Sequence, residues 1–513
     1  MGGLRAGFVE GHAKTAPRVW RPLQFHRRPA YTLWANASYF DGALYDPSKA
    51  VSIDPRTGNV LLGTGNPYNG VVIPGVSAWP KGAIGRVLAA NANVCSGIPC
   101  NNLFAPQISR DYVDREYAVQ PRFGFAYQLN PKMVIRGGVG RYVDRLYPQM
   151  TWVYPGANPP VLTVASLSNV SVDNPGASLA NTATVPPSAF TTDNRKLREP
   201  EAWNWNVAVE RQMPFDSLLS VSYVAHRGLH AWEQYNINQP QAGALQANPG
   251  VNVNYLVPYK GFSSILEEQS VVNSLYNSLQ LYWSRRFKSG WSFGVSYTYS
   301  KSTDGGSNSG NDVVPNTYNT TNLWGPSNYD VRHLAVVNYI YDVPFFKSQK
   351  NLAGKLIGGW EIVGVAQFQT GTPASITTTN DYAGVGGGVN QYWVVNGPVT
   401  TNTGAFAGPV TTANSPRYVT VNVTAPPAGT FNLQPGIRNI VYQPGIQAWN
   451  LGLVKKFAIN ERSGFEFRAE AYDFINHPNL SGPNLNPTSS QFGMITSKTG
   501  IARNLQMSLR FYF

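Results

Sequence analysis

The stretch YNSLQLYWSRRFKSGWSFGVSYTYSKSTD, residues 276–304, decides the fold of this chain. From Trp291 to Tyr299 every second side chain is aromatic or aliphatic, and glycine, serine or threonine stands between them. A period of two places neighbouring side chains on opposite faces of a strand, so residues 291–300 are predicted to form a β-strand with one apolar and one small, polar face. Residues 277–287 predict a partner strand, and 288–290 a tight turn between the two.

This alternation recurs along the chain and predicts twelve strands. They lie at about 31–40, 121–129, 133–142, 203–212, 218–227, 277–287, 291–300, 333–342, 359–369, 448–457, 465–474 and 505–513. The connections alternate between short and long. The short ones are 130–132, 213–217, 288–290 and 458–464, with 343–358 intermediate. The long ones are rich in Asn, Gly, Pro, Ser and Thr, and they are 41–120, 143–202, 228–276, 301–332, 370–447 and 475–504.

Short turns on one side and long loops on the other are typical of bacterial outer-membrane barrels. They are unusual for a soluble β-sandwich, which is the alternative that the alternation alone would allow. Hydrocarbon offers backbone amides no partner, so a sheet crosses a bilayer only by closing on itself. The sequence therefore predicts an all-β fold, an antiparallel transmembrane β-barrel of the cell outer membrane, with short periplasmic turns and long extracellular loops.

The same alternation assigns side chains to lumen or lipid. Charged residues fall on the polar positions of the strands, since a lipid-facing Arg or Lys would cost about 2–4 kcal/mol at the midplane. The predicted lumen charges are Arg122, Arg136, Glu210, Arg286, Glu466, Arg468, Glu470 and Arg510. Tryptophans near strand ends on the opposite face predict aromatic girdles at the two membrane interfaces. These are Trp203, Trp291, Trp360 and Trp449.

Composition narrows the class of protein. Of 513 residues only 13% are charged, whereas 42% are hydrophobic, which disfavours both a cytosolic helical enzyme and a disordered chain. No apolar run reaches the roughly 20 residues of a transmembrane helix, and the basic stretch 1–30 lacks the apolar core of a secretory signal. The net charge of +13 comes from dispersed residues, so no nucleic-acid partner is expected. Cys95 and Cys100 fit either a small loop disulfide or two inert thiols.

No catalytic, cofactor or metal constellation is found, so we expect the protein not to be an enzyme. The glycine run 383–390 has Val389 where a dinucleotide motif needs its last glycine, and it is interpreted as a loop tip. His226 and His230 share a strand end at a spacing that repeats a face without forming a metal pair. A structural hydrogen-bond cluster at the barrel rim is expected for Tyr329, Asp330, Arg332 and His333.

Several motifs together resemble one family. They are PRFGFAYQLN followed by MVIRGGVGRY (121–142), EAWNWNVAVERQ (201–212), SVSYVAHRGLH (220–230), the stretch 276–304, NYDVRHLAVVNYIYDVPF (328–345), GGWEIVGVAQFQTGTP (358–373) and FEFRAEAYDFINHPNL (465–480). The chain resembles the Oar-like TonB-dependent receptors, the acidobacterial type with a carboxypeptidase-regulatory-like N-terminal domain. Its last strand resembles the signal read by the barrel-assembly machinery, with apolar residues at alternate positions: Leu505, Met507, Leu509, Phe511 and Phe513.

The resemblance implies a barrel of about 22 strands, of which this chain would hold the C-terminal half. We expect residues 31–513 to form this part of the barrel, without a plug domain, and residues 1–30 to be an irregular basic segment that is an artefact of the gene sequence. The export signal, TonB-contact motif and plug of the family are not recognised here. A truncated or frame-shifted gene is therefore the leading interpretation, and a natural barrel of twelve strands is the alternative.

The function implied is uptake of a bulky solute, a carbohydrate, peptide or chelate, across the outer membrane. The expected partners are outer-membrane lipid, the TonB complex acting through a plug, the barrel-assembly machinery and the solute itself. The long loops 143–202 and 370–447 would catch the solute, with the segment NQYWVVN (390–396) as a contact. A passive pore, which conducts without TonB, and a structural or adhesive surface protein remain the alternatives.

Overall fold

A computed structural model describes most of the chain. The described residues are 23–27, 37–83, 94–95, 98–114, 117–144, 154–162, 173, 184–308, 312–346, 349, 351–402, 417–459 and 463–513. The side chains of Cys95 and Cys100 lie outside the described part, so neither the disulfide nor the thiol alternative is assessed. Among the described helices, none has the length and apolarity needed to cross a membrane.

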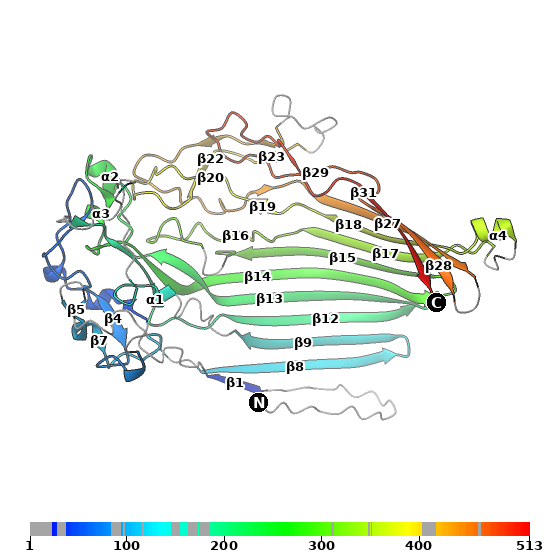
Figure 1. Ribbon diagram of the computed structural model, residues 1–513, viewed down its shortest axis with the longest axis horizontal. Helices are drawn as coiled ribbons and strands as arrows, with labels where there is room; N and C mark the ends of the chain where they lie inside the picture. The colour runs from blue at the N-terminus through cyan, green and yellow to red at the C-terminus, as the bar shows by residue number, and fades with distance from the viewer. Residues whose placement is uncertain are drawn as a thin grey trace.

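One 14-stranded sheet dominates the molecule (Figure 1). Twelve of its strands follow one another in chain order, and each pairs antiparallel with the next. They are β1 (Leu23–Arg27), β8 (Tyr117–Asn130), β9 (Met133–Val143), β12 (Glu201–Met213), β13 (Ser217–Asn236), β14 (Phe262–Lys288), β15 (Trp291–Asp304), β17 (His333–Asp342), β18 (Trp360–Gln369), β27 (Ile446–Ala458), β28 (Gly464–Tyr472) and β31 (Asn504–Tyr512). Two more join from the side, β11 (Ser188–Asp193) on β14 and β16 (Gly325–Pro326) on β15.

The connections lie as the sequence predicts. In Figure 1 the tight connections, the short helix α4 (Leu352–Ile357) and the C-terminus all lie at the right-hand end of the sheet, and the long loops gather at the left and along the top. We call these the short-turn end and the long-loop end. Among the described residues β1 and β31 do not pair with each other, so the sheet is open along both strands. Every residue of β31 is exposed.

The register separates two faces of the sheet. One row of directly paired residues is aromatic or aliphatic over most of its length: Tyr127, Ile135, Val209, Val221, Leu281, Tyr297, Ala335 and Phe368. The next row is mostly small or polar: Ala126, Arg136, Ala208, Ser222, Gln280, Thr298, Leu334 and Gln369. Since paired residues share a face, the sheet has an apolar face and a polar face. Strands β17 and β18 are among those that carry aliphatic residues on both faces.

Eleven of the twelve predicted strands are confirmed, but the one predicted at 31–40 is wrong. Of this segment the structure describes residues 37–40, where only Tyr39 and Phe40 form a strand, β2, which belongs to a separate small sheet with β4 (Val71–Pro74). Both aromatic side chains are fully buried among loop residues, so loop packing and not a membrane face explains their position. The place beside β8 is taken by β1, within the segment 1–30 that was expected to be irregular. That expectation is corrected for residues 23–27, and the rest of the segment lies outside the described residues.

The long loops fold into two lobes. The first lobe, residues 37–83, 94–95, 98–114, 188–199 and 232–265, lies at the left in Figure 1, and the second lobe, residues 370–402, 417–445 and 479–499, lies along the top. The core of the first lobe includes Phe40, Ile73, Leu103, Phe190, Phe262 and Ile265, with a neighbouring group around Tyr39, Tyr112 and Trp232. The core of the second lobe contains Ile376, Trp393, Tyr418, Val419, Val441 and Ile495.

Short strands, helices and 3-10 turns occur within the long loops. In the first half of the chain they are β3 (Val60–Leu61), β5 (Val94–Cys95), β6 (Ile98–Pro99), β7 (Phe104–Ala105), β10 (Thr184–Val185), α1 (Tyr154–Gly156), α2 (Ala244–Ala247) and α3 (Val253–Leu256), with 3-10 turns at Gly42–Leu44, Pro47–Lys49, Lys81–Ala83 and Cys100–Leu103. In the second half they are β19 (Pro373–Ala374), β20 (Thr377–Thr378), β21 (Gln391–Tyr392), β22 (Val394–Val395), β23 (Thr400–Thr401), β24 (Val419–Thr420), β25 (Val423–Thr424), β26 (Val441–Tyr442), β29 (Asn479–Leu480) and β30 (Lys498–Thr499).

Candidate functional site

The candidate site lies at the long-loop end, where β13 and β14 continue beyond their neighbours. The pairing of β12 with β13 stops at Leu229, and that of β15 with β14 stops at Ser274. Beyond these points β13 and β14 stay paired to each other, and β11 takes the place of β15 along β14. Two bulges, between residues 228 and 233, turn this part of β13, and His230 adopts a positive φ of 59° there. The extension therefore projects past the strands of the sheet and carries the first lobe.

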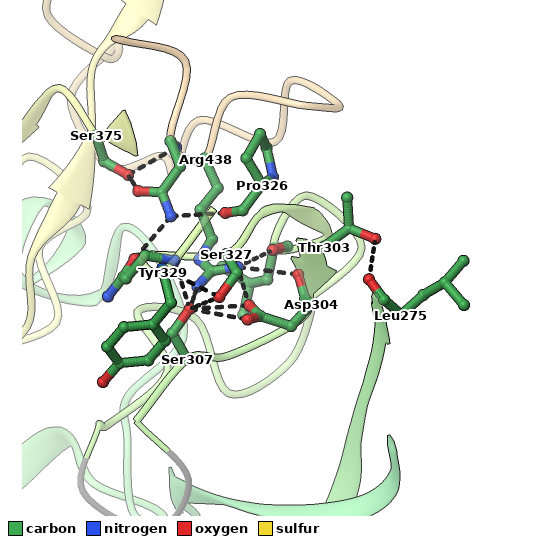
Figure 2. A network of polar contacts seen from close by, with 12 residues as sticks. Leu275, Thr303, Asp304, Ser307, Pro326, Ser327, Tyr329, Ser375 and Arg438 are labelled. Carbon is green, nitrogen blue, oxygen red and sulfur yellow. Dashed lines mark hydrogen bonds and ion pairs between the residues drawn. The ribbon is translucent and has the colours of Figure 1, made fainter. Parts of the chain in front are cut away.

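A buried ion pair ties the second lobe to the end of β15. The Arg438 guanidinium lies 2.5 Å from the Asp304 carboxylate and also donates to the Asp304 backbone carbonyl at 2.9 Å. Its other nitrogen donates to Ser307 Oγ at 2.5 Å, and Ser307 Oγ donates in turn to the same carboxylate (Figure 2). Both charged side chains are less than a tenth exposed. Each charge is thus compensated where water cannot reach it, which a buried ion requires.

Asn439, the residue after Arg438, adds to this attachment. Its side-chain amide donates to the Pro326 carbonyl and to Asn328 Oδ1, each at 2.7 Å. Ser375 Oγ donates to Asn439 Oδ1 at 2.9 Å and accepts from the Asn439 backbone amide at the same distance. The second lobe is consequently fixed to the loop after β15 by a network of directional bonds.

A polar cavity of about 700 Å³ opens beside this network. We call it the mouth cavity. Residues of β13, of the loop after β15 and of the second lobe form its wall. They include Glu233, Gly306, Asp312, Leu323, Tyr392 and Arg438. Because Asp304 and Gln280 lie on the polar side of the sheet, and Arg438 reaches Asp304, the cavity lies where the polar face meets the second lobe.

Glu233 is the unusual group in the wall of the mouth cavity. Its side chain is only 4% exposed, and its Oε2 atom has no hydrogen-bond partner among the described residues. Burial raises the pKa of Glu233 to about 8, with further upward contributions from Asp312, Glu268 and Asp304 and a downward one from Arg438. One strand away, burial raises the pKa of Glu268 to about 7, against a hydrogen bond from Gln234 that lowers it. Both groups lie on the extension, outside the part of the sheet with a full set of neighbours.

A second cavity, of about 720 Å³, lies on the other face of the sheet at the same end. His333, Phe368 and Gln447 contribute to it from the apolar face, and Tyr442 from the second lobe. Beside it Asp330 accepts from Tyr442 Oη at 2.5 Å and from the Ser302 amide at 2.7 Å. Arg332 donates to Tyr442 Oη at 3.1 Å. The hydrogen-bond cluster expected at the rim is confirmed for Asp330 and Arg332. Tyr329 is 67% exposed and donates from its hydroxyl to Asn308 Oδ1 at 3.2 Å, and His333 Nδ1 bonds to the Tyr297 hydroxyl at 2.8 Å.

The register brings nearly all the predicted lumen charges onto the polar face. Arg136 and Glu210 form an ion pair at 3.1 Å, and Arg468 pairs with Glu466 at 2.7 Å. The others placed on this face are Arg122, Glu470 and Arg510, of which Arg510 lies opposite Glu466. Arg286 stands in the stretch where the register of β14 against β15 shifts, so alternation does not assign its face. Its role, like that of the other lumen charges, stays a prediction.

The predicted girdle tryptophans all lie on the apolar face. Trp291 and Trp360 begin β15 and β18 at the short-turn end, whereas Trp203 and Trp449 lie near the long-loop ends of β12 and β27. The residues of the predicted assembly signal share the same face of β31, and Phe513 follows that strand at 97% exposure. The set consists of Leu505, Met507, Leu509, Phe511 and Phe513. The positions agree with the two roles, which remain predictions.

Sequence reasoning missed two cations on the apolar face at the short-turn end. Arg285 donates to the Phe215 carbonyl at 2.7 Å and lies over the Trp291 ring at 3.8 Å. Lys455 donates to the Gly358 carbonyl and lies 5.1 Å from the Trp360 ring. In each case a turn carbonyl and an indole ring satisfy the cation. The signal available was a Trp beginning the neighbouring strand. The mouth cavity was missed as well, because its residues are far apart in sequence.

The fold and site define an outer-membrane barrel, and comparison with known proteins agrees. Residues 31–506 match the family described as outer membrane beta barrel domain, so the chain belongs to that family and to the outer membrane. No curated protein matches its sequence.

Solved structures give a weaker likeness. The outer-membrane transporter YddB of Escherichia coli is 11% identical with a TM-score of 0.42, over 78% of this chain and 41% of that one. The siderophore receptor PirA of Acinetobacter baumannii is 10% identical with a TM-score of 0.40, over 78% and 42%. The FrpB iron transporter of Neisseria meningitidis is 9% identical with a TM-score of 0.36, over 78% and 40%. The chain thus spans about two fifths of the length of these chains.

Proposed function

We propose that this chain is the barrel portion of a TonB-dependent transporter that takes up a bulky solute, a carbohydrate, peptide or chelate, across the outer membrane. The observation that carries the proposal is the mouth cavity, a polar space of about 700 Å³ held between the second lobe and the polar face of the sheet. By the rule for bacterial barrels the long-loop end faces outward. A solute caught in the mouth cavity would therefore enter from outside and meet the lumen next.

The motifs spread from residue 121 to 513 support the Oar-like type of receptor. In such a receptor the outer membrane holds no ATP, so a tight site needs coupling to another energy source to release its ligand. That coupling would come from TonB, acting through a plug domain. Arg136 and Glu210 would line the lumen, the four girdle tryptophans would sit at the lipid interfaces, and β31 would be read by the barrel-assembly machinery.

A conductance measurement separates the transporter from a passive pore. The chain is extracted from native outer membranes in mild detergent and added to a planar lipid bilayer in concentrated KCl. If the protein is a transporter, we expect no stepwise conductance, because the lobes, together with the plug domain of the receptor, would obstruct the lumen. Stable, repeated conductance steps without TonB would instead establish a passive pore.

Crosslinking in living cells separates the transporter from an adhesive protein. Cells are treated with formaldehyde, and the adducts are detected with an antibody against residues 498–513. We expect an adduct that also reacts with an antibody to TonB and that disappears in a strain lacking TonB. A protein that serves only as a surface adhesin gives no such adduct, and its absence in energised cells would refute the transporter.

A further inference from the structure

The charges around the mouth cavity do not balance. The charged residues in its wall are Glu233, Asp312 and Arg438. The Arg438 guanidinium is already paired with Asp304, which leaves the acidic side chains of Glu233 and Asp312 without a cation in the wall, Asp312 as the charged one and Glu233 as one that can ionise. This local excess of negative charge stands in a chain whose net charge is +13. The charge of the mouth cavity is therefore opposite in sign to the net charge of the whole chain.

The two carboxylates are held close together by backbone pairing. The Gln234 amide donates to the Asp312 carbonyl at 3.2 Å, and the Val314 amide donates to the Gln234 carbonyl at 3.0 Å. Residues 312–314 thus run along β13 beside Glu233. Asp312 is the largest charged contributor to the raised pKa of Glu233. The second carboxylate accordingly makes the site more negative, and its own side chain is exposed.

Glu233 is buried and directed at the cavity. It lines the mouth cavity at 4% exposure, and its Oε2 atom, without a hydrogen-bond partner among the described residues, lies against Gly306. A Cβ at position 306 would clash with that oxygen. An ionised carboxylate at this depth needs a hydrogen-bonding partner. Because Glu233 lines the mouth cavity, such a partner can approach it from there.

We propose that the mouth cavity binds a polar solute through a protonated amine or guanidinium group, with Glu233 as the main anionic partner and Asp312 as the second. This deepens the proposed transport function and rests on it. The described residues contain no group of three potential ligands that could hold a metal ion, so an organic cation is the occupant. Leu323 and Tyr392 supply apolar wall against which the carbon chain next to the cation can pack.

The first test is direct binding by calorimetry to the full chain purified from native membranes in detergent. The cationic probes are acetyl-trilysine amide and the glucosamine trimer, and each is compared with its N-acetylated, uncharged form. We expect at least one cationic probe to bind, and neither acetylated form. The probe that binds tells whether the cation belongs to a peptide or to a sugar. Binding of the acetylated forms as tightly as the cationic ones, or binding of no probe, overturns the proposal.

Three variants locate the binding. Glu233→Gln should weaken the affinity by about tenfold to a hundredfold, since a hydrogen bond between two charged groups is lost. Asp312→Asn, at an exposed position, should weaken it less and leaves the fold unaffected. Asp216→Asn is the matched control, because Asp216 is exposed in a turn at the short-turn end, where it pairs with Lys288. Unchanged binding in both Glu233→Gln and Asp312→Asn, with normal heat-modifiable mobility on gels, overturns the proposal.

Proton release gives an independent readout. With its pKa near 8, Glu233 is mostly protonated at pH 7, and it must ionise to pair with a cation. Burial is the main cause of this raised pKa, to which the nearby charges of Asp312, Glu268 and Asp304 add, whereas the charge of Arg438 lowers it. Calorimetry in two buffers of different ionisation enthalpy should show close to one proton released per acetyl-trilysine amide bound, and none in Glu233→Gln. Equal proton release in the two proteins excludes Glu233 as the partner.

The binding assay uses neither TonB nor a membrane. If the TonB adduct forms but no cationic probe binds, the ligand class is wrong and the transporter stands. If the cationic probe binds and the bilayer shows stable conductance, the ligand class is right and the transporter is wrong.

Discussion

Replacing Arg438 by Met should release the second lobe from the end of β15. The substitution removes the ion pair with Asp304 at 2.5 Å, the bond to the Asp304 carbonyl at 2.9 Å and the bond to Ser307 at 2.5 Å. It also leaves the Asp304 carboxylate buried without its cation. Removing one partner of a buried pair typically costs about 3–5 kcal/mol. The network around Asn439 is retained, so the lobe should open locally before the sheet unfolds.

Hydrogen–deuterium exchange measures this opening. Amides of the second lobe that bond within it include those of Trp393, Asn396 and Gln443. If they exchange through release of the lobe, a loss of about 3–5 kcal/mol speeds their exchange by roughly 10²- to 10⁴-fold. Peptides from β8 and β9 should keep their rates.

Two controls make the test specific. Arg417→Met removes an exposed arginine of the same lobe that bonds only to carbonyls of residues 490 and 492 in the described structure, and it should change exchange by less than tenfold. The double variant Asp304→Leu with Arg438→Met removes both charges and should recover part of the protection. If Arg438→Met leaves second-lobe exchange within threefold of the wild type, the ion pair does not hold the lobe.

Three further predictions concern the sheet and the first lobe. Leu281→Arg, on the apolar face in the middle of β14, should lower the free energy of unfolding in lipid vesicles by about 2–4 kcal/mol. Its control, Gln280→Arg on the polar face, should change this free energy by less than about 1 kcal/mol. Equal effects of the two substitutions would contradict the assignment of faces. Ile265→Ala should destabilise the first lobe by about 2–5 kcal/mol and expose it to limited proteolysis while the sheet stays resistant. Burial raises the pKa of Glu268 from 4.5 to about 7, so the folded lobe binds more protons than the unfolded one between these values, and its stability should fall as pH rises from 4.5 to 7 and then level off. In Glu268→Gln the pH dependence of first-lobe amide exchange, corrected for intrinsic rates, should become shallower, with the remainder coming from Glu233, whose pKa is also raised by burial. A slope as steep as in the wild type would contradict the role of Glu268.

The strands were predictable because they obey a local rule. In β15, from Trp291 to Tyr299, one face is buried in lipid and the other contacts a polar interior. Apolar and polar side chains therefore alternate strictly along the sequence of this strand. The ends of β13 and β14 were not predictable, because beyond Leu229 and Ser274 the side chains pack in the first lobe on both faces and the period of two disappears. The predicted strand at 31–40 is wrong for the opposite reason. Tyr39 and Phe40 fill the core of the first lobe, and buried aromatic residues in a loop give the same sequence pattern as a strand.

The candidate site was less predictable than the fold. Glu233 belongs to β13, Asp312 to the loop after β15, and Arg438 to the second lobe, more than 120 residues further along the chain. Nothing in the sequence near any of the three signals the others. Only the register of β13 and the fold of the second lobe bring them together. Arg285 and Lys455 illustrate the same limit in part, because the Trp that begins the neighbouring strand is visible in the sequence but the turn carbonyl that each cation also contacts is not.

The composition of the first lobe has a consequence for the order in which the protein assembles. Its core joins Phe40 and Ile73 from one loop, Phe190 from a second and Phe262 from a third. These loops are separated in the chain by β8, β9, β12 and β13, each of which crosses the membrane. All three loops must therefore have reached the outer side before the core can close. The first lobe can therefore become protease-resistant only after the fourth of these strands has been inserted, so its protease resistance would report that insertion has reached β13.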